Sequence, residues 1–224
     1  MSGDQGTIRA AVVGASGYTG AELLRLLAGH PSMQVVLATG DSQAGAAVGE
    51  VHPGLRAAYP DVVLRSSDPE SWDDRLDDLD VVFLGLPHEV SHELVPRLVD
   101  RVQCVVDLSA AYRIKDRSAY PRWYGFEHQY PEMLARAVYG LPERHRHELT
   151  GAPLIATPGC YVTAATLALA PLVEANLIEE SGVIVDAASG VSGAGRTPKQ
   201  SNHFNSVDED FSAYGLIDHR HTPE

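Results

Sequence analysis

The sequence has few cysteines, no long apolar run and no concentration of positive charge. Only 2 cysteines, Cys104 and Cys160, occur among 224 residues, and their separation fits neither a zinc motif nor a disulfide framework. A reducing compartment is therefore expected. No apolar stretch approaches the roughly 18 residues that a membrane span requires, and residues 1–7 are polar rather than signal-like. These absences together predict a cytoplasmic protein that does not enter a membrane.

The shortage of basic residues also bears on the class of ligand. The formal net charge is −13, and no basic stripe is available to neutralise nucleic-acid phosphates. Much of the acidic charge lies in residues 68–80, which we interpret as a solvated helix face. Nucleic acid is thus not an expected partner, whereas a small anionic substrate would bind where a few arginines converge.

Apolar runs and helical patterns alternate along the first half of the chain. Runs typical of buried strands cover residues 8–13, 34–39, 80–86, 102–108 and 153–156. Helices are expected over residues 21–28, around 91–95, and from 163 to about 175. This order predicts an α/β fold with a Rossmann-type, doubly wound parallel sheet. We expect this domain to span residues 1–157 and a second domain, with a strand at 182–187 and an irregular tail, to span 158–224.

Glycines punctuate the first strand-to-helix turn. Gly14, Gly17 and Gly20 give the spacing G-x-x-G-x-x-G at the position where a dinucleotide's pyrophosphate meets a helix N-terminus. Cofactor binding and a merely tight turn are the two interpretations, and the position favours the first. Asp41 would suit the ribose of NAD, while Thr39 and Ser42 would donate to the 2′-phosphate of NADP. The residues alone leave that choice open.

Cys160 follows Pro158 and Gly159 and directly precedes a helical run. Helix N-termini stabilise thiolates, so the position suits a nucleophile, although a structural cysteine is the alternative. Cys104, inside an apolar strand, is expected in the core. A catalytic cysteine also needs an acid or base, and residues 218–224 supply two histidines, His219 and His221. A solvated tail is the competing interpretation of that segment.

Other polar residues offer weaker signals. His88 and His92 have i, i+4 spacing but no evident third ligand, so we expect a helix surface and no metal site. The loop at residues 189–196 would let backbone approach a nicotinamide or a substrate, or would be a flexible surface loop. Arg113, just past a strand end, is either an anion clamp or part of a surface salt bridge.

Seven stretches, taken in order, resemble N-acetyl-gamma-glutamyl-phosphate reductases. They are residues 14–25, 85–88, 107–110, 139–143, 158–163 (Pro-Gly-Cys-Tyr-Val-Thr), 189–196 and 219–224 (His-Arg-His-Thr-Pro-Glu). The family usually has Asp-Phe-Arg where this chain has residues 111–113 (Ala-Tyr-Arg), and Pro where Val162 stands. Its members also continue well past the final histidine motif, so we expect a fragment in which the α+β catalytic domain is incomplete.

The resemblance implies an activity and assigns residues to it. It implies that NADP(H) is used to reduce N-acetyl-L-glutamyl 5-phosphate, a small acyl phosphate, to the 5-semialdehyde through a cysteine thioester, in a homo-oligomer (dimer or tetramer). The implied catalytic residues are Cys160, His221 and His219. The implied cofactor-binding residues are Gly14, Ser16, Gly17, Tyr18, Thr19, Gly20, Thr39, Ser42, Ser189, Gly190, Ser192 and Gly193. The implied substrate-binding residues are Arg113, Arg196 and Glu224.

Two other functions remain open on the sequence. One is reduction of a carrier-protein-bound aminoadipate 6-phosphate in lysine biosynthesis, which uses the same catalytic plan. The other is a non-catalytic dinucleotide-binding protein or an inactive fragment, which would need the glycine turn but no cysteine and histidine pair.

Overall fold

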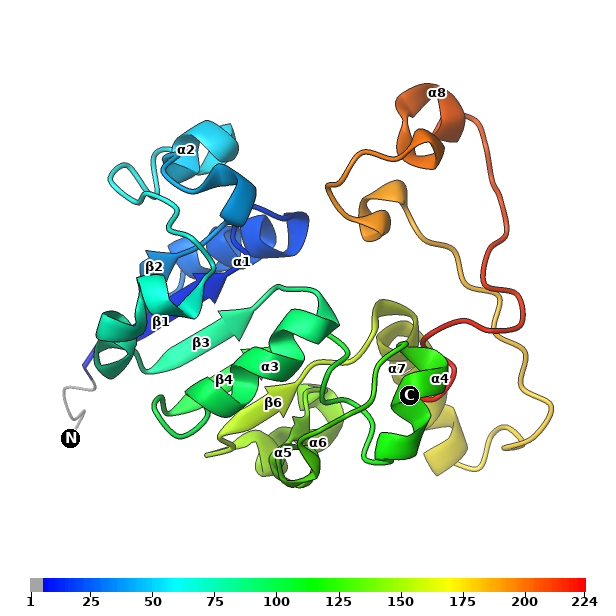
Figure 1. Ribbon diagram of the computed structural model, residues 1–224. Coiled ribbons are helices and arrows are strands. Elements are labelled where there is room, and N and C mark those ends of the chain that lie inside the picture. The colour runs from blue at the N-terminus through cyan, green and yellow to red at the C-terminus, as the bar shows by residue number, and fades with distance from the viewer. Residues whose placement is uncertain (1–5) are drawn as a thin grey trace.

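A six-stranded parallel sheet forms the centre of the molecule in a computed structural model that describes residues 6–224 (Figure 1). The strand order is β2-β1-β3-β4-β6-β5. The strands are β1 Ile8–Val13, β2 Met33–Ala38, β3 Val81–Leu84, β4 Cys104–Asp107, β5 Val138–Tyr139 and β6 Leu154–Ala156. The helices are α1 Tyr18–Ala28, α2 Val48–Val51, α3 His88–Leu98, α4 Tyr120–Trp123, α5 Pro131–Arg136, α6 Pro142–Leu149, α7 Cys160–Glu174 and α8 Phe204–Val207. The predicted doubly wound parallel sheet is confirmed.

Successive residues of β1 feed two separate cores, one on each face of the sheet. Val12 packs with Leu24 of α1, whereas Val13 packs with Val95 of α3, and all four side chains are 0% exposed. A strand that is buried on both faces has no polar side to show. This is why residues 8–13 read as one apolar run rather than as an alternating pattern.

Two helices begin earlier than the sequence pattern indicated. Helix α1 starts at Tyr18 because Gly17 is extended and its carbonyl accepts the first intrahelical hydrogen bond, from the Ala21 N–H. Helix α7 starts at Cys160 itself, after an extended Gly159. The cysteine is therefore part of the first helical turn rather than a few residues ahead of it.

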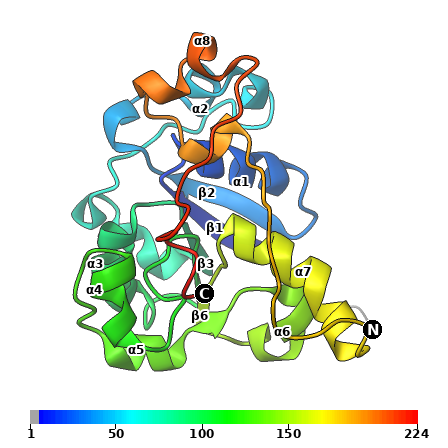
Figure 2. The same ribbon diagram turned by 90° about the vertical axis from the view of Figure 1, so that its right-hand side faces the viewer.

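The strand expected at residues 182–187 does not form. Within the described part of the chain no strand pairs with this segment, and Ile184 at its centre is 92% exposed. β-rich side chains stabilise a strand only where a neighbouring strand and a core face receive them. The chain instead leaves α7, passes through residues 182–187 to α8, and then returns to end beside α7 and the sheet (Figures 1 and 2).

Among residues 6–224, no helix is both long enough and apolar enough to cross a membrane.

His92 was expected on a helix surface, but the structure buries it. His92 is 3% exposed and His128 is 4% exposed, and their rings meet edge to face with centroids 4.6 Å apart. Each ring is held at both nitrogens: His92 Nδ1 by Glu93 (2.8 Å) and Nε2 by the Gln129 N–H (3.1 Å). His128 Nε2 donates to the Ala111 carbonyl (3.0 Å), and the Tyr130 N–H donates to Nδ1 (3.3 Å). His92 points inward because it lies on the face of α3 that packs against the loop after β4.

Burial in this cluster makes the stability of the fold sensitive to acid. Burial, reinforced by the nearby His92, lowers the pKa of His128 to about 4. Between pH 6.5 and about 4 the unfolded chain binds a proton that the folded chain does not, so stability falls as pH falls through that window, by about 2–3 kcal/mol in total. Measured by denaturant unfolding, the stability of the His128→Gln variant should depend less on pH than that of the natural protein. The exposed His147→Gln variant should keep the natural dependence. An unchanged slope in His128→Gln would contradict this assignment.

Candidate active site

The glycine turn between β1 and α1 depends on close backbone contacts. Gly14 has a φ of +87°, and a Cβ there would lie 2.4 Å from the Gly85 carbonyl oxygen. A Cβ on Gly20 would lie 2.4 Å from the Gly14 carbonyl oxygen. The turn is therefore folded so tightly that side chains at these positions are excluded. The first N–H groups of α1 are left pointing out of the turn, as an anion site requires.

Thr39 supports this turn from inside the protein, which differs from its expected role at a 2′-phosphate. The residue is 0% exposed, and its hydroxyl accepts from the Gly14 N–H (3.2 Å) and shares a hydrogen bond with Ser67 (2.8 Å). Asp41 is exposed, and one of its carboxylate oxygens accepts from the Ser67 N–H (2.9 Å). After β2, Asp41 and Ser42 are the polar residues left exposed to a ligand, while Thr39 is not.

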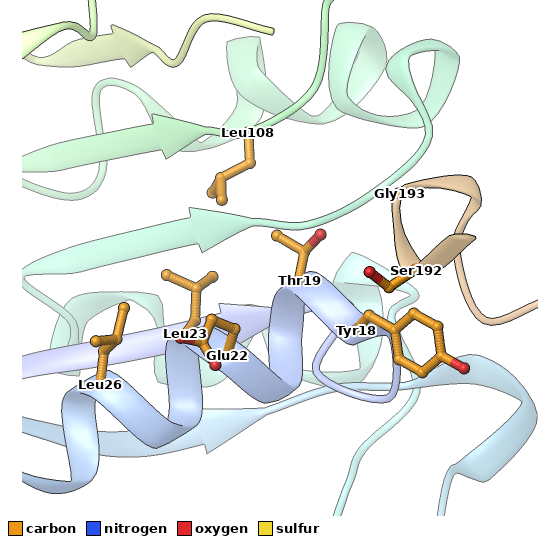
Figure 3. A pocket seen from close by; sticks show the side chains of 8 residues that line it. All are labelled: Tyr18, Thr19, Glu22, Leu23, Leu26, Leu108, Ser192 and Gly193. Atoms are coloured by element: carbon orange, nitrogen blue, oxygen red, sulfur yellow. The ribbon is translucent and has the colours of Figure 1, made fainter. Parts of the chain in front are cut away.

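The two glycine-rich segments lie against each other. A pocket of about 400 Å³ is lined by Tyr18 and Thr19 at the start of α1 and by Ser192 and Gly193 of the short turn Val191–Ala194, with Leu108 beyond the end of β4 (Figure 3). Its other lining residues are Glu22, Leu23 and Leu26. The structure thus brings together four of the residues expected at the cofactor, from positions far apart in the chain. Ser189 and Gly190 line neither this pocket nor the one beside it.

Arg196 reaches the glycine turn, whereas we expected it at the substrate. Its Nη1 donates to the Ser16 carbonyl (2.6 Å), and the side chain lines a neighbouring pocket of about 350 Å³ together with Tyr18 and Ser192. Because the Ser16 carbonyl belongs to the turn that precedes α1, Arg196 ties the second glycine-rich loop to the first.

His221 lies against Gly159, the residue that precedes Cys160. Cys160 opens α7 and its side chain is exposed. A Cβ added to Gly159 would lie 2.5 Å from His221 Nε2, so the imidazole rests on the glycine next to the cysteine. Burial lowers the pKa of His221, and the nearby Glu224 carboxylate opposes that shift. A neutral imidazole beside the first turn of α7 is suited to take a proton from a thiol.

His219 braces His221 from the side. Its Nδ1 accepts from the His221 N–H (3.1 Å), and the two rings meet edge to face at 4.7 Å. Tyr161 lies next to both rings, with centroids 5.2 and 5.9 Å away. Its hydroxyl bonds the Tyr214 hydroxyl at 2.6 Å. This aromatic cluster holds the returning segment of the chain against α7.

Arg113 and Glu224 bind each other rather than an open cleft. Arg113 Nη1 lies 2.8 Å from Glu224 Oε1, and the two side chains are 8% and 0% exposed. Arg113 also donates to the Leu108 carbonyl (3.0 Å), while the Gly159 N–H donates to Glu224 Oε2 (2.8 Å). Both residues were expected to hold substrate; the structure pairs them with each other, and Glu224 also binds the residue before Cys160.

Some residues of the site were not singled out from the sequence. The Tyr124 hydroxyl donates to Glu224 Oε1 (3.2 Å), and burial followed by the charge of Glu224 raises the pKa of Tyr139 to about 12. Asp107, fully buried at the end of β4, accepts from the Ser109 N–H (3.0 Å), and burial raises its pKa. Tyr139 lies in a stretch that carried the family resemblance, which was its one signal. Asp107 likewise lies in such a stretch, residues 107–110, whereas Tyr124 had no signal, because its partner is set by tertiary contacts.

Comparison with known proteins decides the family. The profile of the semialdehyde dehydrogenase NAD binding domain matches residues 9–152, which is more than half of the chain. The chain belongs to the semialdehyde dehydrogenase family. The dimerisation domain of the same family matches residues 160–224.

Individual relatives within the semialdehyde dehydrogenases agree with this assignment. The chain is 50% identical over 214 residues to an N-acetyl-gamma-glutamyl-phosphate reductase of Methanopyrus kandleri, covering 95% of this chain and 61% of that protein. It is 48% identical to the reductase of that name from Aquifex aeolicus, covering 97% and 62%. A crystal structure of aspartate semialdehyde dehydrogenase with NADP from Candida albicans shares the fold, with a TM-score of 0.53 and 20% identity over 75% of this chain and 47% of that one. The chain spans about 62% of the length of the curated relatives it matches.

The glycine turn predicts a sharp difference between two alanine substitutions. Gly14→Ala would push a Cβ against the Gly85 carbonyl and strain a φ of +87°, so we expect a loss of stability of about 1–3 kcal/mol and weakened dinucleotide binding. Gly29→Ala is the matched control, because a Cβ there meets nothing within 4 Å. Thermal unfolding and cofactor titration would measure both effects. Equal behaviour of the two variants would show that the turn is not constrained as described.

The two cysteines should differ in reactivity. Cys160 is exposed, whereas burial raises the pKa of Cys104 to about 11. Near neutral pH we expect iodoacetamide to modify Cys160 faster by on the order of 100-fold, because the thiolate is the reacting form. Peptide mass spectrometry after timed labelling would measure the ratio, with Cys160→Ser as the reference for Cys104 alone. Comparable rates at the two sites would contradict the prediction.

Proposed function

We propose that this chain carries the cofactor domain and the cysteine site of an NADPH-dependent N-acetyl-gamma-glutamyl-phosphate reductase. The observation that carries the proposal is the placement of Cys160 at the start of α7 with His221 resting on Gly159. Relatives of that name that are 48–50% identical over at least 95% of the chain support the choice of substrate. The carrier-bound aminoadipate substrate has no such support.

The glycine turn and its neighbours fit a dinucleotide. The tight turn that Gly14 and Gly20 allow and the pocket between Thr19 and Ser192 would hold the cofactor between the two glycine-rich loops. NADPH, when bound, supplies the hydride that reduces the acyl group. The choice of NADP over NAD rests on the resemblance to the reductases; after β2 both Asp41 and Ser42 are exposed, and Ser42 would donate to the 2′-phosphate.

The reaction follows from the groups around Cys160. His221 takes the thiol proton, and the thiolate attacks the carbonyl carbon of the acyl phosphate, so that the carbon–sulfur bond forms and phosphate leaves. When the thioester carbon is reduced, the His221 imidazolium gives its proton to the carbonyl oxygen, which leaves a thiohemiacetal on Cys160. Its collapse breaks the carbon–sulfur bond, releases the semialdehyde and returns the proton to sulfur. The free N–H groups of the first turn of α7 stabilise the thiolate and the developing oxyanion.

The assembly and the compartment are part of the same proposal. The match of residues 160–224 to a dimerisation domain supports a homo-oligomer, a dimer or tetramer. The two cysteines are both free thiols, which supports a reducing compartment such as the cytoplasm.

Reversing the reaction tests the function and the nucleophile together. The full natural protein should reduce NADP when given N-acetyl-glutamate semialdehyde and phosphate, and Cys160→Ser should keep cofactor binding while losing roughly 10³-fold or more in rate. The rise of NADPH absorbance measures both. Cys104→Ser is the control and should stay active, since Cys104 lies within β4. Turnover by Cys160→Ser near the natural rate would remove the nucleophile assignment. If the reaction of the unmodified protein did not depend on phosphate, the proposed acyl phosphate substrate would be wrong.

A further inference from the structure

The carboxylate of Glu224 is the point where separate parts of the chain meet. It receives a hydrogen bond from Arg113 Nη1 (2.8 Å), from the Tyr124 hydroxyl (3.2 Å) and from the Gly159 N–H (2.8 Å). Arg113 lies on the loop after β4, Tyr124 directly follows α4, and Gly159 immediately precedes Cys160. Glu224 itself follows the two histidines. One side chain therefore connects the nucleotide-binding sheet, the cysteine helix and the histidine loop.

All three partners are hydrogen-bond donors, and the site is closed. The Glu224 side chain is 0% exposed, and each of its oxygens is occupied. A carboxylate so enclosed has no free oxygen to offer a substrate. Its negative charge is balanced by the buried guanidinium of Arg113, whose other amino group is held by the Leu108 carbonyl. This closure argues against a substrate contact at Glu224.

We propose that Glu224 is a positioning residue that sets the geometry between Cys160 and His221, rather than a residue that binds substrate. Through the Gly159 N–H it fixes the residue on which the imidazole rests, and through Arg113 it anchors the histidine loop to the sheet. The inference deepens the proposed function and rests on the same site. It goes beyond the proposed function because it assigns the relative placement of nucleophile and base to one buried ion pair, that of Arg113 and Glu224.

Glu224 also acts on His221 through its charge. The ionisable groups near this imidazole are Glu224, His219, Arg113 and Arg220, with Tyr161 packed against its ring. Of the charged groups, Glu224 alone favours the imidazolium, while both arginines and His219 oppose it. Removing the carboxylate should therefore move the titration of His221 to lower pH. A residue with only a packing role would leave that titration unchanged.

The decisive variant is Glu224→Gln in the full natural protein. Glutamine keeps the shape but presents an NH₂ group to a neighbour that is itself a donor, and it leaves Arg113 without its counter-charge. We expect the NMR titration of the His221 ring, assigned with His221→Gln, to shift to lower pH. We also expect kcat to fall roughly 10²-fold, as for a misplaced reacting pair, with KM within roughly twofold of the natural value.

Two further variants keep the test independent of folding and of the substrate. Glu174→Gln removes an exposed carboxylate at the far end of α7, paired with Arg144, and should change neither the titration nor kcat. Glu224→Asp keeps the charge on a shorter side chain, so it should retain the His221 titration and still lose turnover. Cofactor binding reports folding for all of them.

The outcomes separate this inference from the proposed reaction. An unmoved His221 titration in Glu224→Gln would overturn the positioning role, as would a raised KM at unchanged kcat, which is the signature of a substrate contact. Should the protein fail to act on N-acetyl-glutamate semialdehyde at all, the His221 titration would still decide the role of Glu224.

Discussion

The ion pair between Arg113 and Glu224 joins parts of the chain that no secondary-structure element connects. It links the loop after β4 to a residue 111 positions later and is almost completely excluded from solvent. Removing one partner of such a pair strands a buried charge and costs about 3–5 kcal/mol, whereas the intact pair adds little net stability. Its consequence is therefore geometric. The histidine loop has one strongly favoured position against α7, because any other position would leave a buried charge unpaired.

The parallel sheet explains why the other parts of the site meet at one edge. The carboxyl ends of β1, β3, β4 and β6 lie side by side and lead to the glycine turn, Gly85, Asp107 and Cys160 respectively. Ligands of open α/β sheets bind outside these ends. The cofactor turn and the cysteine helix are thus neighbours for a topological reason. The short connection from Ala156 to Cys160 carries the sulfur directly from the sheet edge into a helix N-terminus.

Local patterns made the sheet and the glycine turn predictable, whereas pairings between residues far apart in the chain could not be predicted from the sequence. An apolar run marks β1 because that strand is buried on both faces, and Gly14 is required by a contact that a Cβ would prevent. The inward orientation of Thr39 depends on Ser67, and the burial of His92 depends on a loop residue, Gln129. The expected strand at 182–187 was wrong because its apolar residues signal a strand only where a partner strand exists. Periodicity carries no information about such partners.

Polar contacts, rather than core packing, hold the cysteine helix in place. None of the residues of α7 is buried in the described chain, and Leu167 and Leu172 along it are 38% and 39% exposed. A helix is ordinarily positioned by its apolar face, and here that face makes no core. What fixes the helix is the chain that leads into it, where the Thr157 N–H donates to the Asp107 carbonyl (2.9 Å) and the Gly159 N–H donates to Glu224. Cys160, the nucleophile of the proposed reaction, is the first residue of the helix and lies next to these two contacts.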